Sequence, residues 1–596
     1  MTGDTPIDRV AWKDWSGQTL VASRAEGKPV LLALTATWCH WCHVMDQTSY
    51  SDPRVIELVN KHFMPVRVDV DQRPDLSARY NQGGFPSLAL LDSSGAVIEG
   101  RVYTPPDDMV RLLEQVSSSY ADGSYVAPPS GLTHGDSPKI QEGGTAGLVI
   151  QRLEELYDPL FGGFGDEPKQ PPWDGIDLLL SVYHRNGERR RRDMACRTLD
   201  GILNGLLDHK DGGFFRYSVS RDWKVPHYEK MLVTNARSIS SFLTAFQVTG
   251  KRSYKNAALS ALNYLMTTLR DPATGLFWAS QDAGEEYYRL PWKNRNSAAK
   301  PSIDTTLYSG WNALAARALI HAYGVLGTPA YLKQANHVLD TLWGESWDTN
   351  LGLAHTVNDA LGETRFLSDH VHAMGGYIDL YQATGGKPQL QRAEAVFEAI
   401  KRLFTAPDGG FYDTSGTGTS MPGIKPVLEN ALVAEALTAL AAVTGEERYL
   451  DSAGAILDAF SGAVPGRSYV GPPGARRMEE DEERLFLPAA SAWARAWNTM
   501  DSRPVHLVVV GDRAHRATKA LVNAALKART PGWAVQFLDP GIEADMVERL
   551  GFPVDGAPAA YLCVGRQCLT PFLSPAELRK WTRPGALASF SGSIQH

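Results

Sequence analysis

Cysteine is scarce in this sequence, with only five among 596 residues. That number is too small for the dense disulfide framework that holds small secreted domains together. The chain also lacks an apolar run that approaches the ~20 residues needed to cross a bilayer. Its first residues, 1–12, carry no apolar segment of the kind that directs export. These absences predict a cytoplasmic protein without a membrane partner, whose thiols are kept reduced.

Positive charge is not in excess either. Asp and Glu number 67 against 59 Lys and Arg, which gives a formal net charge of −8. A general nucleic-acid-binding protein needs a basic face to neutralise phosphates, and the basic run 189–192 is typical of a solvated helix face. We therefore expect no nucleic-acid partner. A hydrophobic content of 43% lies near globular averages and excludes a disordered or collagen-like chain.

The first 125 residues alternate between strand-like and helix-like segments. Residues 28–35 form a short apolar run, typical of a strand buried on both faces, and residues 66–71 alternate as a second strand. Residues 87–98 are typical of a hairpin, and residues 109–120 of a closing helix. The sequence predicts one α/β domain over residues 1–125.

Cys39-His40-Trp41-Cys42-His43 follows the first predicted strand and opens a helix-like stretch. A strand that runs into Cys-x-x-Cys at a helix start is the thioredoxin pattern, and the helix N-terminus lowers the pKa of the first cysteine. Gly83-Gly84-Phe85-Pro86 precedes the next strand, where thioredoxin-like folds place a cis-proline beside the cysteines. We interpret Cys39 as the attacking thiolate, Cys42 as the resolving thiol and Pro86 as part of the substrate groove.

Three other interpretations of the cysteine pair stay open. Cys-x-x-Cys-His also fits c-type haem attachment, which normally needs export. The two cysteines with the neighbouring histidines fit a zinc site, and the pair is also consistent with a structural role without turnover. Thioredoxin has a buried aspartate six residues before its first cysteine, where this chain has Ala33, so His40, His43 or water would have to move the proton. We expect neither a metal nor a cofactor.

The middle of the chain is a repeat of helix pairs. Residues 126–145 are rich in Pro, Gly and Ser and are predicted to be a linker. From 146 to 500, two kinds of glycine turn alternate between Ala- and Leu-rich stretches of helical spacing. In turns of the first kind, an Asp is followed within a few residues by Gly and then by an aromatic residue or Leu. These turns contain Gly162, Gly212, Gly275, Gly352 and Gly409. Six such pairs predict a closed (α/α)6 barrel rather than an open solenoid.

The loops at one end of such a barrel surround a funnel, so their polar residues are candidate catalytic groups. A proline before His227-Tyr-Glu-Lys230 indicates a helix that begins there and puts His227 and Lys230 on one face, beside Glu229. This trio can supply an acid/base pair with an orienting cation, or only a network that holds the loop. Asp282 and Asp304 add carboxylates that fit glycoside hydrolysis. The candidate ligand-binding residues are Trp223, Trp311, Asn312 and Asp369.

The last residues, 501–596, form a second small α/β unit. Residues 505–511, 533–538 and 559–564 are strand-like, and residues 514–528 between the first two are helix-like. This alternation predicts a small parallel sheet. Cys563 has apolar neighbours and is expected to be a buried thiol.

Several motifs occur in a fixed order along nearly the whole chain: Cys39-His-Trp-Cys42-His-Val-Met45, Gly163-Phe-Gly165-Asp-Glu-Pro-Lys169, Phe215-Arg-Tyr-Ser-Val219, Val225-Pro-His-Tyr-Glu-Lys-Met-Leu232, Ser280-Gln-Asp-Ala283 and Trp311-Asn312. In this order they resemble the spermatogenesis-associated protein 20 family of thioredoxin-domain proteins. The resemblance implies a thioredoxin-like domain joined to a six-hairpin glycosidase-like barrel similar to that of the N-acylglucosamine 2-epimerases. The chain departs from the family pattern at Asn81-Gln82, which leads directly into Gly83, and at Leu428-Glu429-Asn430.

The predicted fold class is thus multidomain: a thioredoxin-like α/β domain, an (α/α)6 six-hairpin barrel and a small C-terminal α/β domain. Our leading hypothesis is a thiol–disulfide redox protein fused to a carbohydrate-type barrel and acting on a protein disulfide client. The second is a sugar epimerase, isomerase or hydrolase that acts on a small sugar-like ligand through His227, Glu229, Asp282 and Asp304. The third is a non-enzymatic scaffold whose thiols sense oxidation. Sequence alone defines neither the substrate nor the oligomeric state.

Overall fold

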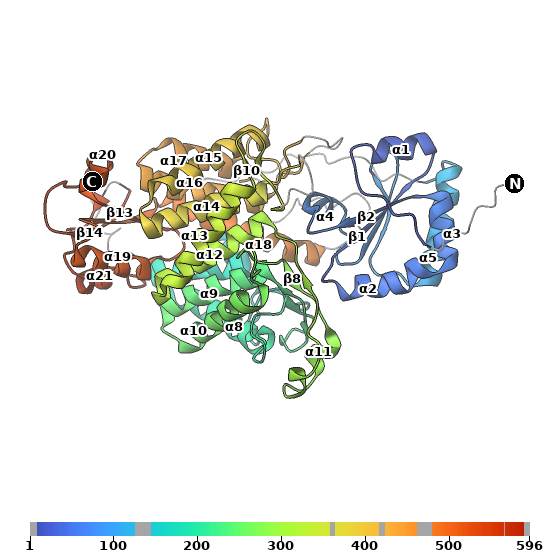
Figure 1. Cartoon of the computed structure of the whole chain (residues 1–596), viewed down its shortest axis with the longest axis horizontal. Coiled ribbons are helices and arrows are strands. Elements are labelled where there is room, and N and C mark those ends of the chain that lie inside the picture. Colours follow the sequence, from blue (N-terminus) through green and yellow to red (C-terminus); the bar gives the residue numbers. More distant parts are fainter. Residues whose placement is uncertain are drawn as a thin grey trace.

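The computed structural model describes residues 9–125, 145–357, 364–416, 423–461, 479–565 and 567–588. Three units follow one another along the long axis of the molecule, with the helical barrel in the middle (Figure 1). The predicted linker lies outside the described residues except for Thr145, where the first barrel helix begins. The predicted multidomain fold is confirmed.

The N-terminal unit is a four-stranded sheet with the strand order β2-β1-β3-β4. Its strands are β1 (Val30–Thr35), β2 (Met64–Asp69), β3 (Ser87–Leu91) and β4 (Val97–Arg101). Its helices are α1 (Thr19–Glu26), α2 (His40–Gln47), α3 (Pro53–His62), α4 (Pro74–Tyr80) and α5 (Pro106–Ala121). β1 pairs parallel with β2 and antiparallel with β3, and apolar clusters cover both faces of the sheet. Because β1 is buried on both faces, its sequence is a continuous apolar run.

The barrel has an inner and an outer ring of helices. The inner ring is α7 (Trp173–Asn186), α9 (Leu232–Thr249), α12 (Ser309–Leu326), α14 (Leu367–Thr384), α16 (Val427–Thr444) and α18 (Glu479–Asp501). Each inner helix contacts the next, and α18 contacts α7, so the ring closes. The outer ring is α6 (Thr145–Leu156), α8 (Arg189–Leu206), α10 (Arg252–Tyr264), α13 (Pro329–Glu345), α15 (Lys387–Phe404) and α17 (Arg448–Asp458). The predicted (α/α)6 barrel is confirmed.

Short strands and one short helix lie in the loops that precede the inner helices. They are β5 (Tyr217–Ser218), β6 (Pro226–His227), β7 (Lys230–Met231), β8 (Ser280–Gln281), α11 (Glu285–Arg289), β9 (Ile303–Asp304), β10 (Trp347–Asp348) and β11 (Gly352–Leu353). The predicted helix at His227 is therefore wrong. Pro226 and His227 pair with β5 as a strand, and helix α9 begins only at Leu232. Consequently His227 and Lys230 do not share a helical face.

Glycine turns connect the helix pairs as the sequence predicts, since Gly162, Gly212, Gly275, Gly352 and Gly409 all have positive φ. In three of these turns a lysine ammonium bridges an Asp carboxylate and a glycine carbonyl. The three bridges are Lys169 to Asp158 and Gly162, Lys230 to Asp208 and Gly212, and Lys425 to Asp408 and Gly409. We call this arrangement the lysine clamp. It fixes the turn because it binds a carboxylate and an otherwise unpaired carbonyl at once.

The C-terminal unit contains β12 (Val505–Val510), α19 (Arg516–Ala528), β13 (Trp533–Leu538), α20 (Pro540–Arg549), β14 (Ala559–Val564), β15 (Gln567–Cys568) and α21 (Pro575–Trp581). Its sheet order is β13-β12-β14-β15, with β12 parallel to β13 and antiparallel to β14. The predicted parallel sheet is therefore wrong for β14, because β13 ends beside Val510 and β14 begins beside the same residue, so the chain does not cross back to the start of β12. The result is the strand order and directions of the N-terminal unit, repeated at the other end of the barrel.

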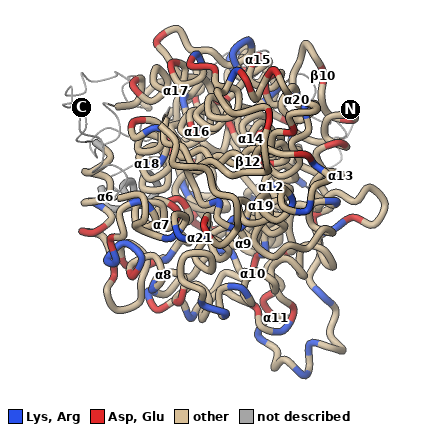
Figure 2. Tube along the Cα trace, turned by 90° about the vertical axis from the view of Figure 1, so that its left-hand side faces the viewer, with Lys and Arg blue, Asp and Glu red and all other residues tan. Residues whose placement is uncertain are grey.

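The structure also bears on two further expectations, which concern Cys563 and membrane-spanning helices. Cys563 is buried as predicted, but it is not a thiol: it forms a disulfide with Cys568, its direct partner across β14 and β15. Among the described helices, α16 alone is long and apolar enough to cross a membrane, and 67% of it is buried as an inner barrel helix. Figure 2, which looks onto the end with the C-terminal unit, shows Lys and Arg interspersed with Asp and Glu.

Candidate functional site

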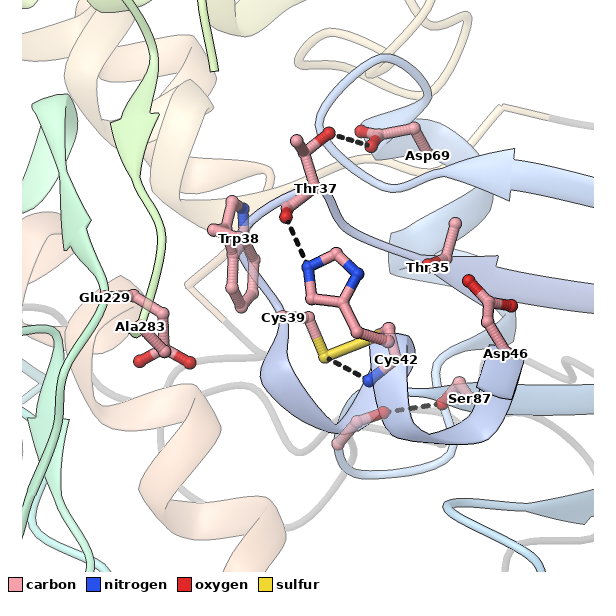
Figure 3. Close-up of a disulfide and its surroundings, with 12 residues drawn as sticks. Thr35, Thr37, Trp38, Cys39, Cys42, Asp46, Asp69, Ser87, Glu229 and Ala283 are labelled. Atoms are coloured by element: carbon pink, nitrogen blue, oxygen red, sulfur yellow. Dashed lines mark hydrogen bonds between the residues drawn. A yellow bond between two sulfur atoms is a disulfide. The ribbon is translucent and has the colours of Figure 1, made fainter. Parts of the chain in front are cut away.

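The cysteine pair sits where β1 delivers the chain to the start of α2. Cys39 is the N-cap residue of α2, and its Sγ accepts a hydrogen bond of 3.2 Å from the backbone N–H of Cys42. The two sulfur atoms form a disulfide (Figure 3). When the pair is reduced, the same N–H groups and the helix dipole stabilise a Cys39 thiolate. The predicted order of strand, Cys-x-x-Cys and helix is confirmed.

The turn before β3 lies beside the cysteines. The Phe85–Pro86 peptide bond is cis, as the analogy with thioredoxin implies. The Phe85 ring meets the Trp38 ring edge-on, with centroids 5.9 Å apart. Trp38, Cys39 and Cys42 belong to one apolar cluster, against which Phe85 packs. Pro86 is itself buried, and its role in a substrate groove stays a prediction.

The barrel covers the cysteine pair. Cys39 is only 4% exposed and Cys42 only 2%. Met231 of β7 belongs to the same apolar cluster as the cysteines, and Val233 and Trp311 of the barrel pack against that cluster. The two cysteines are therefore largely shielded from solvent where the two units meet.

Polar contacts also join the two units. The Arg216 guanidinium lies over the Trp38 ring, 4.1 Å from its centroid. His355 donates from Nε2 to the Asp71 carbonyl oxygen (2.8 Å) and from Nδ1 to the Asp369 carboxylate (2.7 Å). Since both partners are acceptors, the ring carries both protons. Burial opposes that charge, but the Asp369 carboxylate prevails and raises the pKa of His355.

The Asp71 carboxylate also lies in this junction. It accepts a hydrogen bond of 2.6 Å from Trp38 Nε1. Burial, followed by the nearby Asp69 carboxylate, raises the pKa of Asp71 to about 7. The Arg216 guanidinium lowers it, whereas the Asp304 carboxylate raises it. The junction thus carries several carboxylates that repel one another.

The structure brings three of the predicted barrel residues to the cysteine side. His227 Nδ1 lies 3.2 Å from Glu229 Oε1, and the His227 ring stacks on Tyr217 with centroids 4.5 Å apart. Asp282 Oδ2 lies 3.8 Å from His43 Nε2 of the cysteine motif. Figure 3 places Glu229 across from Trp38 and Cys39. Asp282 and Glu229 therefore line the barrel side of the junction.

Other predicted site residues have structural surroundings. Lys230 is fully buried and forms the lysine clamp with Asp208. Trp223 is 1% exposed, and its Nε1 donates to the Phe161 carbonyl. The Asn312 side-chain amide accepts from the Phe277 N–H and donates to the carbonyl oxygens of Phe277 and Tyr308. The role of each in binding or catalysis stays a prediction that the arrangement does not favour.

Asp304 and Trp311 lie closer to the junction. Asp304 accepts hydrogen bonds from the backbone N–H and the hydroxyl of Thr306. Together with burial, its carboxylate raises the pKa values of Asp69 and Asp71. Trp311 packs on the cluster of the cysteines. Both residues thus border the N-terminal unit.

Sequence reasoning missed two groups of polar residues. The first is the set that joins the units, Asp71, Arg216 and His355, which are far apart in the chain. The second lies on the inner helices: Asp177 bonds to Ser241, Asp174 pairs with Arg237, and the partly exposed His372 has no partner for Nδ1 among the described residues. Charges within the apolar inner helices are the signal that could have revealed the second group.

Within the described ranges no group of three His, Cys, Asp or Glu side chains is arranged to hold a metal ion. His43 is the histidine of the motif that approaches a carboxylate, and its Nε2 lies 3.0 Å from the Thr37 carbonyl oxygen.

Comparisons with known proteins agree with this architecture. Residues 4–124 match the Thioredox_DsbH family model, described as "Protein of unknown function, DUF255". Human spermatogenesis-associated protein 20 is 24% identical over 97% of this chain and 90% of its own length. The resemblance expected from the motifs is thereby confirmed.

Two partial similarities concern single units. The thiol:disulfide interchange protein DsbD of Campylobacter jejuni is 25% identical over 15% of this chain and 16% of its own length. The solved structure of cellobiose 2-epimerase from Bacillus thermoamylovorans aligns with a TM-score of 0.48 at 12% identity, over 58% of this chain and 95% of that chain.

Proposed function

We propose that this protein is a thiol–disulfide oxidoreductase that works through Cys39 and Cys42. The observation that carries the proposal is the position of Cys39 at the N-cap of α2, where the Cys42 N–H already points at its sulfur. An N–H donor at a helix start favours the thiolate, which is the nucleophile of disulfide exchange. The similarity of this unit to a thiol:disulfide interchange protein supports the same chemistry.

Thiol–disulfide exchange needs a group that accepts and releases protons. Ala33, which stands where thioredoxin has its buried aspartate, cannot do this. His43 stands one residue after Cys42, its side chain is 44% exposed, and Asp282 of the barrel approaches its Nε2. We assign His43 the transfer of protons between the thiols and water. Asp282 would hold the ring in place, so the barrel contributes to the redox site.

The experiment measures reduction of 2-hydroxyethyl disulfide by the full chain, with dithiothreitol as the external reductant. Cys39→Ser should abolish turnover, because it removes the attacking thiolate. Cys42→Ser should allow the first attack and leave a mixed disulfide on Cys39, visible by mass spectrometry. Cys196→Ser is the matched control, since Cys196 is a buried free cysteine in outer helix α8. Unchanged turnover in Cys39→Ser would sink the proposal.

A second candidate, sugar conversion inside the barrel, is favoured by the unpartnered His372. Its Nδ1 has no partner among the described residues, and Arg317 and Arg237 are near enough to lower its pKa after burial has done so. A neutral imidazole beside charged groups can act as a general base. Product analysis over a panel of aldoses and disaccharides, with wild type and His372→Asn, tests this candidate. Equal conversion by both proteins would exclude His372 as the base.

A further inference from the structure

We infer that the substrate of the cysteine pair is a small disulfide rich in hydroxyl groups, bound between Cys39 and the barrel, and not a protein disulfide. The inference rests on the proposed function and names the substrate class of the same site. Three observations carry it: the burial of the sulfur atoms, the unpartnered acceptors that face them, and the excess of carboxylates around them.

Size is limited by the docked barrel. Met231 shares an apolar cluster with Cys39 and Cys42, and Arg216 lies over Trp38, so the surface on which thioredoxin-like proteins receive a client is occupied. The more open side chains are His43 and Asp282, whose exposed fractions are 44% and 24%. These two side chains, 3.8 Å apart, mark the more exposed edge of the covered surface, and access to the disulfide from one edge suits a small molecule.

Hydrogen-bond chemistry then limits the ligand further. We call Glu229, Ser280 and Asp282 the polar wall: Glu229 directly precedes β7, Ser280 opens the paired strand β8, and Asp282 directly follows β8. Figure 3 shows Glu229 across from Trp38, and Asp282 approaches His43. Glu229 Oε2 and Ser280 Oγ are buried without a hydrogen-bond partner in the described chain. Buried polar atoms are normally satisfied, and an ionised carboxylate can only accept. A ligand that satisfies this wall must bring donors, and hydroxyl groups supply them without charge.

Charge argues against an anionic disulfide. Asp69, Asp71 and Asp304 add to the two carboxylates of the wall, and burial together with the Asp304 carboxylate raises the pKa of both Asp69 and Asp71. The positive groups nearby already have partners: Arg216 is stacked on Trp38, and His355 bonds to the Asp369 carboxylate. An added carboxylate would meet like charges here, which weakens binding.

The chemistry balances as ordinary thiol–disulfide exchange. The Cys39 thiolate attacks one sulfur of the substrate, forms a mixed disulfide and releases the first thiolate. The Cys42 thiolate then attacks Cys39 Sγ, releases the second thiolate and leaves the Cys39–Cys42 disulfide. Two electrons pass to the substrate, and the two thiol protons pass to its products. An external dithiol reduces the protein disulfide by the same two steps.

The test compares kcat/KM of the full chain for four oxidised substrates, with dithiothreitol as reductant. They are bis(β-D-glucopyranosyl) disulfide, 2-hydroxyethyl disulfide, glutathione disulfide and insulin. We expect the glucosyl disulfide to exceed glutathione disulfide and insulin by about tenfold or more, as one or two added hydrogen bonds provide. Equal or faster reduction of glutathione disulfide or insulin would overturn the inference and leave the proposed function intact. Reduction of none of the four would overturn both.

A variant of the polar wall separates binding from a structural role. Glu229→Gln keeps the shape of the wall and removes one charge. We expect it to raise KM for the glucosyl disulfide several-fold more than KM for 2-hydroxyethyl disulfide. A parallel loss with both substrates would mean that the wall supports the fold and does not select the ligand.

Discussion

At the residue scale, the junction depends on polar side chains that are held where water is largely excluded. Asp71 is the clearest, because its backbone carbonyl binds His355 and its carboxylate binds Trp38. Burial raises its pKa to about 7, so the folded state resists ionisation that the unfolded chain accepts near pH 3.8. The benefit of the neutral form is complete below the unfolded value and is lost as pH rises through about 7.

Asp71→Asn should therefore flatten the pH dependence of stability. The amide cannot ionise, so the variant gains on wild type as pH rises from 5 to 8. Thermal unfolding of both proteins at these two pH values checks this. Asp69 and Glu429 also have pKa values raised chiefly by burial and leave a residual slope in the variant. An identical pH dependence in wild type and Asp71→Asn would contradict the assignment.

The same residues show where sequence reasoning stops. Cys39, Cys42 and Pro86 could be assigned a redox role because their signal is local: a strand, a motif and a turn at short range. Asp71, Arg216 and His355 gave no signal, since each is an ordinary charged residue until two domains meet. Lys230 is the converse case: it lies in a motif rich in chemistry-bearing residues and forms a clamp at the base of a turn, and its catalytic role stays a prediction.

At the scale of elements, the repeated turns explain why the barrel could be predicted from glycines. Positive φ at five turns requires residues that tolerate it, so the glycines stay visible in the sequence. The lysine clamp then ties the turn to the chain that enters the next inner helix. It recurs at Lys169, Lys230 and Lys425, but the three sites differ in burial. The strands β5 to β9 could not be predicted, because two-residue strands carry no periodicity.

The clamps should differ in strength according to that burial. Lys230 and Asp208 are buried, so Lys230→Met leaves an uncompensated carboxylate and should cost about 3–5 kcal/mol of stability. Asp208 keeps one partner, Arg295, which places the cost at the lower end. Lys425→Met faces the exposed Asp408 and should cost ~0–1 kcal/mol. Denaturant unfolding of both variants measures the difference, and equal costs would refute the burial argument.

At the scale of the whole molecule, two small α/β units of the same strand order close the two ends of one barrel (Figure 1). Only the N-terminal unit carries cysteines at a helix start, whereas the other has its disulfide between β14 and β15. Gln382 and Tyr381 of α14 bond to β13, so the second unit is fixed to the far ends of the inner helices. The N-terminal unit with its Cys39–Cys42 pair is therefore the one placed at the loops, where the polar wall lies.

Loosening the junction should change the choice of client. Met231→Asp puts a charge into the apolar cluster that holds the cysteines against the barrel. We expect the variant to reduce insulin faster than wild type while losing activity toward the glucosyl disulfide. His506→Asn, in the C-terminal unit, is the control and should leave the ratio of the two activities unchanged. A variant with the wild-type ratio would show that the barrel does not exclude protein clients.

The most direct measurement is to identify what Cys39 captures. Cys42→Ser, first reduced and freed of reductant, is offered an equimolar mixture of insulin and bis(β-D-glucopyranosyl) disulfide, and its adducts are determined by intact mass spectrometry with peptide mapping. The account predicts a thioglucose adduct on Cys39 and no insulin-chain adduct. An insulin-chain adduct on Cys39, or no adduct at all, would contradict it.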